Sequence, residues 1–224
     1  MSTSDVESLS AVVDAVNEAF FYGRALSHAR RERMAKQIAS RQGLPGSYAG
    51  MFAPAETDFK QGIRFFTGER IKTRAGTAHI LGEEACRALI LLDVNAASVR
   101  DALERATVGM VARLKAERRP GMYCCGKCSC AYWRHLSVGG LENSQRRLAE
   151  GMNALKSHRD GQGRWQTFPY YYTLLALSEL DLPSAIKEMR YAAEGCEQYL
   201  KRTPSDDKYA QRRQALAERV LAKC

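Results

Sequence analysis

The sequence has few prolines, no long low-complexity tract and no long apolar run. It has 6 prolines among 224 residues and few runs of β-branched residues, which argues against disorder and against an extensive sheet. No stretch approaches the roughly 18 to 20 uncharged apolar residues that crossing a bilayer requires. The first residues, MSTSDVESLSAVVDAV, lack the basic segment and the cleavage site of a secretory signal. We therefore expect a cytoplasmic globular protein with no membrane partner.

Cysteine and charge are the two unusual features of the composition. The chain has 7 cysteines, and an odd number without an export signal favours free or metal-bound thiols over permanent disulfides. The net charge of +9 favours anionic partners. The basic stretch from His28 to Gln42 is typical of a solvated helical face. Binding of nucleic acid through this stretch is a weaker expectation.

Residues 1–70 are predicted to form an N-terminal helical segment. Apolar residues recur at steps of three and four from Leu9 to Phe20, which predicts one long helix or two joined helices between about Asp5 and Arg41. Glycines and prolines predict a loop over 43–54. A short helix is expected over 55–66, followed by a connection over 67–77.

The rest of the chain carries an internal repeat. Nearly apolar segments cover 79–94, 128–138 and 168–180, and amphipathic segments cover 98–118, 141–157, 183–201 and 206–222. Gly109, Gly151 and Gly195 recur in the amphipathic segments, 42 and 44 residues apart. A period of 41–45 residues predicts stacked helical hairpins with the apolar helices inside. We therefore expect a single all-α domain over 1–224, with hairpin repeats over 79–224.

One hairpin resembles those of a known class. Asp160, Gly161 and Gly163 allow a tight reversal of the chain, and Trp165 can fill the space between adjacent hairpins. With the apolar helix that follows, this stretch resembles the repeat of the α/α toroids of terpenoid cyclases and protein prenyltransferases. The resemblance covers about 79–202.

The resemblance implies a toroid-like ring, while the period also fits an open α-solenoid of the HEAT type. The aspartate-rich motif of the cyclases is missing, and the zinc ligands of the prenyltransferases have no matching positions. The resemblance therefore implies a fold and no catalytic residue.

A cysteine-rich turn replaces the reversal one repeat earlier. The stretch PGMYCCGKCSC contains Cys124, Cys125, Cys128 and Cys130. The Cys125-x-x-Cys128 spacing is typical of zinc ligands. Because four ligands within seven residues are sterically crowded around one ion, we expect a ligand from elsewhere, with His135 and His79 as candidates. An iron–sulfur cluster is the alternative cofactor.

Two other interpretations of the cysteines stay open. The sequence CGKC, from Cys125 to Cys128, matches the CxxC of thiol–disulfide exchange proteins at a helix start. Alternatively, the thiols only pack as small apolar side chains, and no cofactor is bound.

An aromatic group completes the candidate residues. Its members are Trp133, Trp165, Tyr170, Tyr171 and Tyr172. They are expected in the core or, if the central face is open, in a pocket for a hydrophobic or planar ligand.

Two functions follow from these features. One is a module that binds a small molecule, a protein or an anionic ligand, as a monomer or a homodimer, with a metal-binding cysteine loop. The other is an enzyme of terpenoid-cyclase-like fold that uses the loop, through a metal or a thiol, beside the aromatic pocket. The residues alone do not choose between an enzyme and a binding module.

Overall fold

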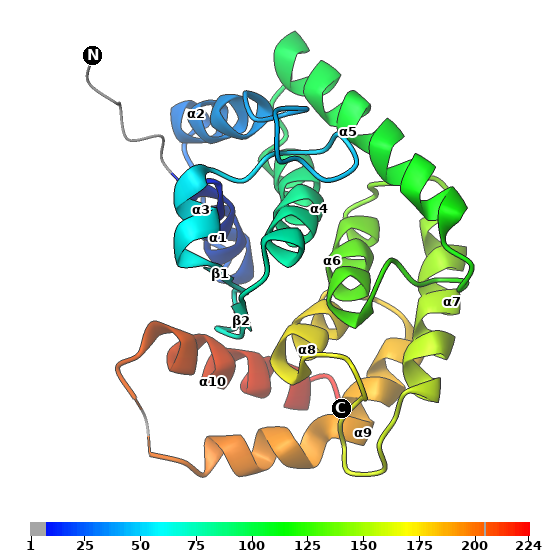
Figure 1. Ribbon diagram of the computed structural model, residues 1–224. Coiled ribbons are helices and arrows are strands. Elements are labelled where there is room, and N and C mark those ends of the chain that lie inside the picture. Colours follow the sequence, from blue (N-terminus) through cyan, green and yellow to red (C-terminus); the bar gives the residue numbers. More distant parts are fainter. Residues whose placement is uncertain (1–7, 204) are drawn as a thin grey trace. The chain divides into compact units, whose positions relative to one another are not determined.

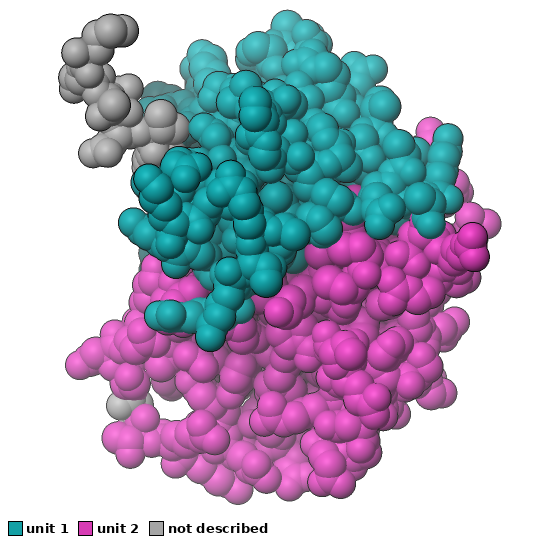
Figure 2. All heavy atoms as spheres, in the orientation of Figure 1, with its two compact units in different colours: residues 1–63, 70–116 teal, residues 64–69, 117–224 magenta. Residues whose placement is uncertain are grey.

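The computed structural model describes residues 8–203 and 205–224 (Figure 1). Over these residues the chain forms ten helices and one two-stranded sheet, which confirms the prediction of a mostly helical protein. None of the helices in this part of the chain combines the length and the apolarity that crossing a bilayer requires. Contacts divide the chain into two compact units, drawn in different colours in Figure 2: unit 1 comprises 1–63 and 70–116, and unit 2 comprises 64–69 and 117–224.

Unit 1 is organised around one long buried helix. Its helices are α1 (Leu9–Phe21), α2 (His28–Ala39), α3 (Glu56–Gln61), α4 (Arg74–Leu92) and α5 (Ala97–Ala116). Helix α4 contacts each of the other four and is buried along most of its length. Two separate helices therefore cover the stretch for which one long or two joined helices were predicted. The predicted start of the first helix at Asp5 lies outside the described residues.

The predicted helix over 55–66 is wrong beyond Gln61. There α3 ends at Gly62, which has a φ of +68°, a backbone conformation that glycine adopts without a steric penalty. The chain continues as β1 (Ile63–Arg64), which pairs with β2 (Arg70–Ile71). The buried Ile63 and Phe66 thus belong to a hairpin and not to one helical face.

Unit 2 alternates buried helices with amphipathic ones. Its helices are α6 (Gly126–Ser137), α7 (Ser144–Ser157), α8 (Tyr170–Ser178), α9 (Pro183–Leu200) and α10 (Lys208–Leu221). The nearly fully buried α6 and α8 pack on each other, α6 also packs on α7, and α8 also packs on α9 and α10. The amphipathic α7 and α9 contact each other as well. Within this unit, α6 with α7 and α8 with α9 are the helices that the sequence predicts for two successive hairpins.

The repeated glycines lie at close contacts between helices. A Cβ atom at Gly151 of α7 would lie 2.4 Å from Nε1 of Trp133 on α6, and one at Gly195 of α9 would lie 2.3 Å from the hydroxyl oxygen of Tyr170 on α8. In unit 2, α7 and α9 therefore each have a glycine against which an aromatic side chain of the preceding buried helix packs. Gly109 of α5 serves a similar purpose in unit 1, where a Cβ atom would lie 1.7 Å from the carbonyl oxygen of a loop residue, Ala49.

Gly151→Ala is expected to lower the free energy of unfolding by about 1 to 3 kcal/mol, because the added methyl group would overlap the Trp133 indole. At a helical position without such a contact, the same exchange raises stability by roughly 0.5 to 1 kcal/mol. Urea denaturation followed by circular dichroism measures the difference. Asn153→Ala, at an exposed position of the same helix, is the control, with an expected change within about 0.5 kcal/mol. A Gly151→Ala variant as stable as the parent protein would contradict the close contact.

Candidate metal centre

The loop before α6 is held in place by hydrogen bonds to its backbone. The Ser129 hydroxyl accepts a hydrogen bond from the Tyr123 N–H at 3.0 Å and donates one to the Cys125 carbonyl at 2.8 Å. The Arg119 guanidinium donates to the carbonyl oxygens of Tyr123 and Cys124, at 3.3 and 3.0 Å. These bonds determine where the first two cysteines of the cluster lie.

The same loop is anchored by packing. The indole N–H of Trp133 donates a hydrogen bond to the Gly121 carbonyl oxygen at 2.8 Å. On the other side of the loop, a Cβ atom at Gly126, the first residue of α6, would lie 2.5 Å from the Thr167 carbonyl oxygen. The helix start that carries the cysteines is therefore fixed from both sides within unit 2.

Three thiols converge at this helix start. Cys125 is the N-cap residue of α6, with an extended backbone, and it is exposed, whereas Cys124 is partly buried and Cys128 is buried. The Sγ atoms of Cys124 and Cys128 lie within 4.8 Å of each other. Hydrogen bonds from the side chains of Cys124 and Cys128, and from the backbone N–H groups of Cys128 and Lys127, lower the pKa of Cys125 to about 2. The exposed sulfur is thus stabilised as a thiolate.

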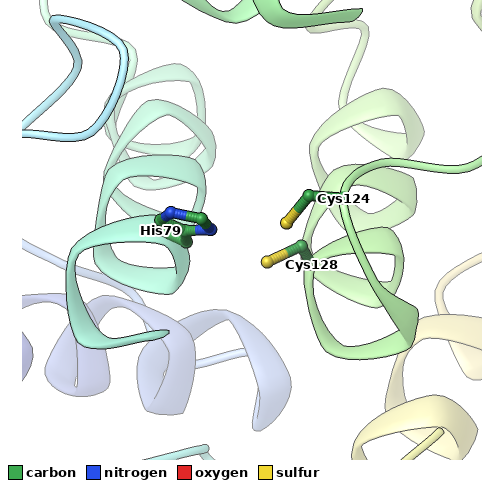
Figure 3. A group of neighbouring side chains, drawn as sticks. All are labelled: His79, Cys124 and Cys128. Atoms are coloured by element: carbon green, nitrogen blue, oxygen red, sulfur yellow. The ribbon is translucent and has the colours of Figure 1, made fainter. Parts of the chain in front are cut away.

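The described residues contain a candidate His/Cys metal-binding group formed by His79, Cys124 and Cys128. Figure 3 shows the three side chains, from α4, from the loop before α6 and from the first turn of α6. Within unit 1 the His79 ring stacks on Tyr48, with ring centroids 3.5 Å apart. The Tyr48 hydroxyl in turn accepts a hydrogen bond from Nε of Arg113 at 2.6 Å. Imidazole nitrogen and thiolate sulfur are the ligand types that zinc prefers.

The other predicted ligands lie in different surroundings. Cys130 is fully buried, its Sγ lies 3.4 Å from the Thr173 hydroxyl oxygen, and burial raises the pKa of its thiol. His135 is also fully buried and packs against Gly140, where a Cβ atom would lie 2.2 Å from Nε2 of the imidazole. Neither belongs to the candidate group, and their assignment as metal ligands stays a prediction.

The predicted aromatic residues fill the interior of unit 2. Four of the five are buried: Trp133, Trp165, Tyr170 and Tyr172. The Trp165 indole N–H donates to the Glu188 carboxylate at 2.9 Å, and the Tyr170 hydroxyl donates to the Ala192 carbonyl oxygen at 2.8 Å. Tyr171 is partly exposed and meets the Tyr199 ring edge to face. Their role as a ligand pocket stays a prediction.

Three residues that position the site, Ser129, Tyr48 and Arg119, were not singled out from the sequence. Ser129 lies four residues after Cys125, the spacing at which a serine can donate to a carbonyl one helical turn earlier, so this contact had a weak local signal. Tyr48 and Arg119 had none, because their contacts depend on how the loops fold back.

Comparisons with protein-family models, with curated proteins and with solved structures found no match to this chain. The function therefore has to be inferred from the site.

In the metal-free protein, alkylation of Cys125 by iodoacetamide is expected to change by less than about twofold between pH 8 and pH 6. Its lowered pKa keeps the thiolate fraction complete over that range. The exposed Cys224 is the internal control: burial of its sulfur raises its pKa, so its rate should fall about 100-fold, tenfold for each pH unit. Mass spectrometry of tryptic peptides after timed alkylation measures both rates. A fall of tenfold per pH unit at Cys125 would show that its thiolate is not stabilised.

Proposed function

We propose that this chain is a zinc-binding helical interaction module in which His79, Cys124 and Cys128 hold the ion. The proposal is carried by the candidate group that these three side chains form. Sulfur and imidazole ligands favour zinc over magnesium or calcium, which take oxygen ligands. The hydrogen bonds that fix the loop before α6 would lower the entropic cost of ordering the two thiolates around an ion.

Cys125 is the fourth ligand in this proposal. It is supported by the position of Cys125 at the N-cap of α6, next to Cys124 and three residues before Cys128, and by the pKa of its thiol, which the two neighbouring cysteine side chains lower. With four protein ligands a zinc site is closed to water and contributes to folding stability. If Cys125 stays unligated, the site keeps an open position, the arrangement of catalytic zinc centres. That outcome would favour the alternative function, an enzyme that uses the cysteine loop as its active site.

The rest of the chain would supply the binding surface. The proposal includes a stacked-hairpin array, toroid-like or open, since such arrays bind partners on extended concave faces. The net charge of +9 favours an anionic small molecule or an acidic protein as the partner.

The purified protein is expected to carry about one zinc ion per chain, as measured by elemental mass spectrometry. His79→Ala and Cys128→Ser should each weaken zinc binding by more than the roughly 10- to 100-fold that loss of a second-shell contact causes. Competition with a chromogenic chelator measures the affinity. Substitution with Co²⁺ gives the geometry, because tetrahedral cobalt bound to thiolates absorbs strongly in the visible range.

Matched controls separate this ligand set from its alternatives. Cys130→Ser and Cys196→Ser replace buried thiols outside the group and should leave the affinity unchanged. His135→Ala tests the other histidine that the sequence predicts. A loss of zinc in His135→Ala but not in His79→Ala would overturn the proposed set. A cobalt spectrum unchanged by Cys125→Ser would show three protein ligands and an open position.

A further inference from the structure

We propose that the cysteine loop is also a peroxide-sensitive switch, in which a Cys125–Cys128 disulfide and a bound zinc ion exclude each other. Formation of the disulfide is a property of unit 2 alone and needs no metal. Only the release of zinc rests on the proposed function.

The three sulfurs differ in access to solvent. Cys125 is exposed and Cys124 is partly buried, while Cys128 is 2% exposed. An oxidant in solution therefore meets Cys125 first. Cys125 is the N-cap residue of α6 and Cys128 lies in the first turn of that helix, so the two cysteines are three residues apart at the helix start, the spacing at which side chains share one face. An accessible thiol next to a second, resolving thiol is an arrangement typical of redox-sensing cysteines.

The neighbouring cysteines are poorer partners for Cys125. A disulfide between the adjacent Cys124 and Cys125 would close a small ring around a peptide bond that prefers to be planar and trans. Cys130 lies two residues after Cys128, on the opposite side of α6, and its sulfur lies 3.4 Å from the Thr173 hydroxyl oxygen. This leaves Cys128, which lies in the first turn of the helix that Cys125 caps.

The reaction balances with hydrogen peroxide as the oxidant. The Cys125 thiolate attacks one peroxide oxygen, the O–O bond breaks, and hydroxide leaves, giving a sulfenic acid at Cys125. The Cys128 sulfur then attacks the Cys125 sulfur, forms the S–S bond and displaces the oxygen as water. In total the Cys125 thiolate and the Cys128 thiol lose two electrons and one proton. The hydroxide takes up one further proton from the solvent, so the peroxide is reduced to two molecules of water.

The disulfide would remove the zinc ligands. A disulfide sulfur carries no thiolate charge, and zinc binds the thiolate form of cysteine. Oxidation therefore takes Cys128, and with it Cys125, out of the ligand set. In the reverse direction, a bound ion occupies the same sulfur electron pairs and should slow their oxidation.

Peptide mapping of the metal-free, full-length protein tests the switch. Trypsin cleaves after Lys127 and so separates Cys124 and Cys125 from Cys128 and Cys130. After a stoichiometric dose of hydrogen peroxide, the two peptides should be joined in non-reducing conditions, with fragmentation placing the bond at Cys125 and Cys128. The number of titratable thiols should fall by two, and dithiothreitol should restore it.

Single variants decide which sulfurs react. Cys125→Ser and Cys128→Ser should each abolish the cross-link, whereas Cys124→Ser and Cys130→Ser should keep it. A bond mapped to Cys124, or oxidation at Cys125 that stops at the sulfenic or sulfinic acid, would overturn the proposed pair.

A second arm tests mutual exclusion in the zinc-loaded protein. Peroxide should release one ion, detected with a chromogenic chelator, for each disulfide formed, and oxidation should be at least about tenfold slower than in the metal-free protein. Disulfide formation at the same rate with zinc still bound would refute the exclusion. If the protein binds no zinc, the proposed function fails, while the metal-free arm still decides the disulfide.

Discussion

The indole of Trp133 lies against the backbone of α7 at Gly151 and holds the Gly121 carbonyl through its N–H. This contact sets the distance between α6 and α7, because a side chain at Gly151 would occupy the space that the indole fills. It also fixes the start of the loop that carries the cysteines. Ser129 and Arg119 then place the loop backbone. The site therefore depends on a close contact made possible by the absence of a side chain.

The chemistry of the loop follows from its position at a helix start. Backbone N–H groups in the first turn have no partner within the helix, and those of Lys127 and Cys128, together with two neighbouring thiols, lower the pKa of Cys125. Such a cluster stabilises negative charge on sulfur. The proposed zinc site and the proposed disulfide use the same sulfur atoms. In the zinc site the thiolates bind a cation, and in the disulfide two of the sulfurs share a covalent bond.

Much of the secondary structure could be predicted because it depends on local patterns. The alternation of apolar and amphipathic segments placed α5 to α10 close to their observed bounds, whereas α4 begins at Arg74, inside the connection predicted over 67–77. The prediction failed at Phe66, where Gly62 ends α3 and the apolar residues that follow enter a hairpin. Apolar spacing over so short a stretch does not distinguish a helix from a turn followed by a strand. Here Gly62, with its positive φ, ends the helix and lets the chain turn into the strand.

The candidate site, too, could be predicted only in part from the sequence. The spacing from Cys124 to Cys128 alone indicated a thiol cluster at a helix start, because residues three or four apart lie on the same face of a helix. Spacing did not choose between His79 and His135 as the additional ligand. His135, on the same helix as Cys128, packs against Gly140, while His79 belongs to the candidate group from a distant part of the chain. A choice of this kind depends on tertiary structure, since a ligand from another helix is placed by packing and not by the number of residues between.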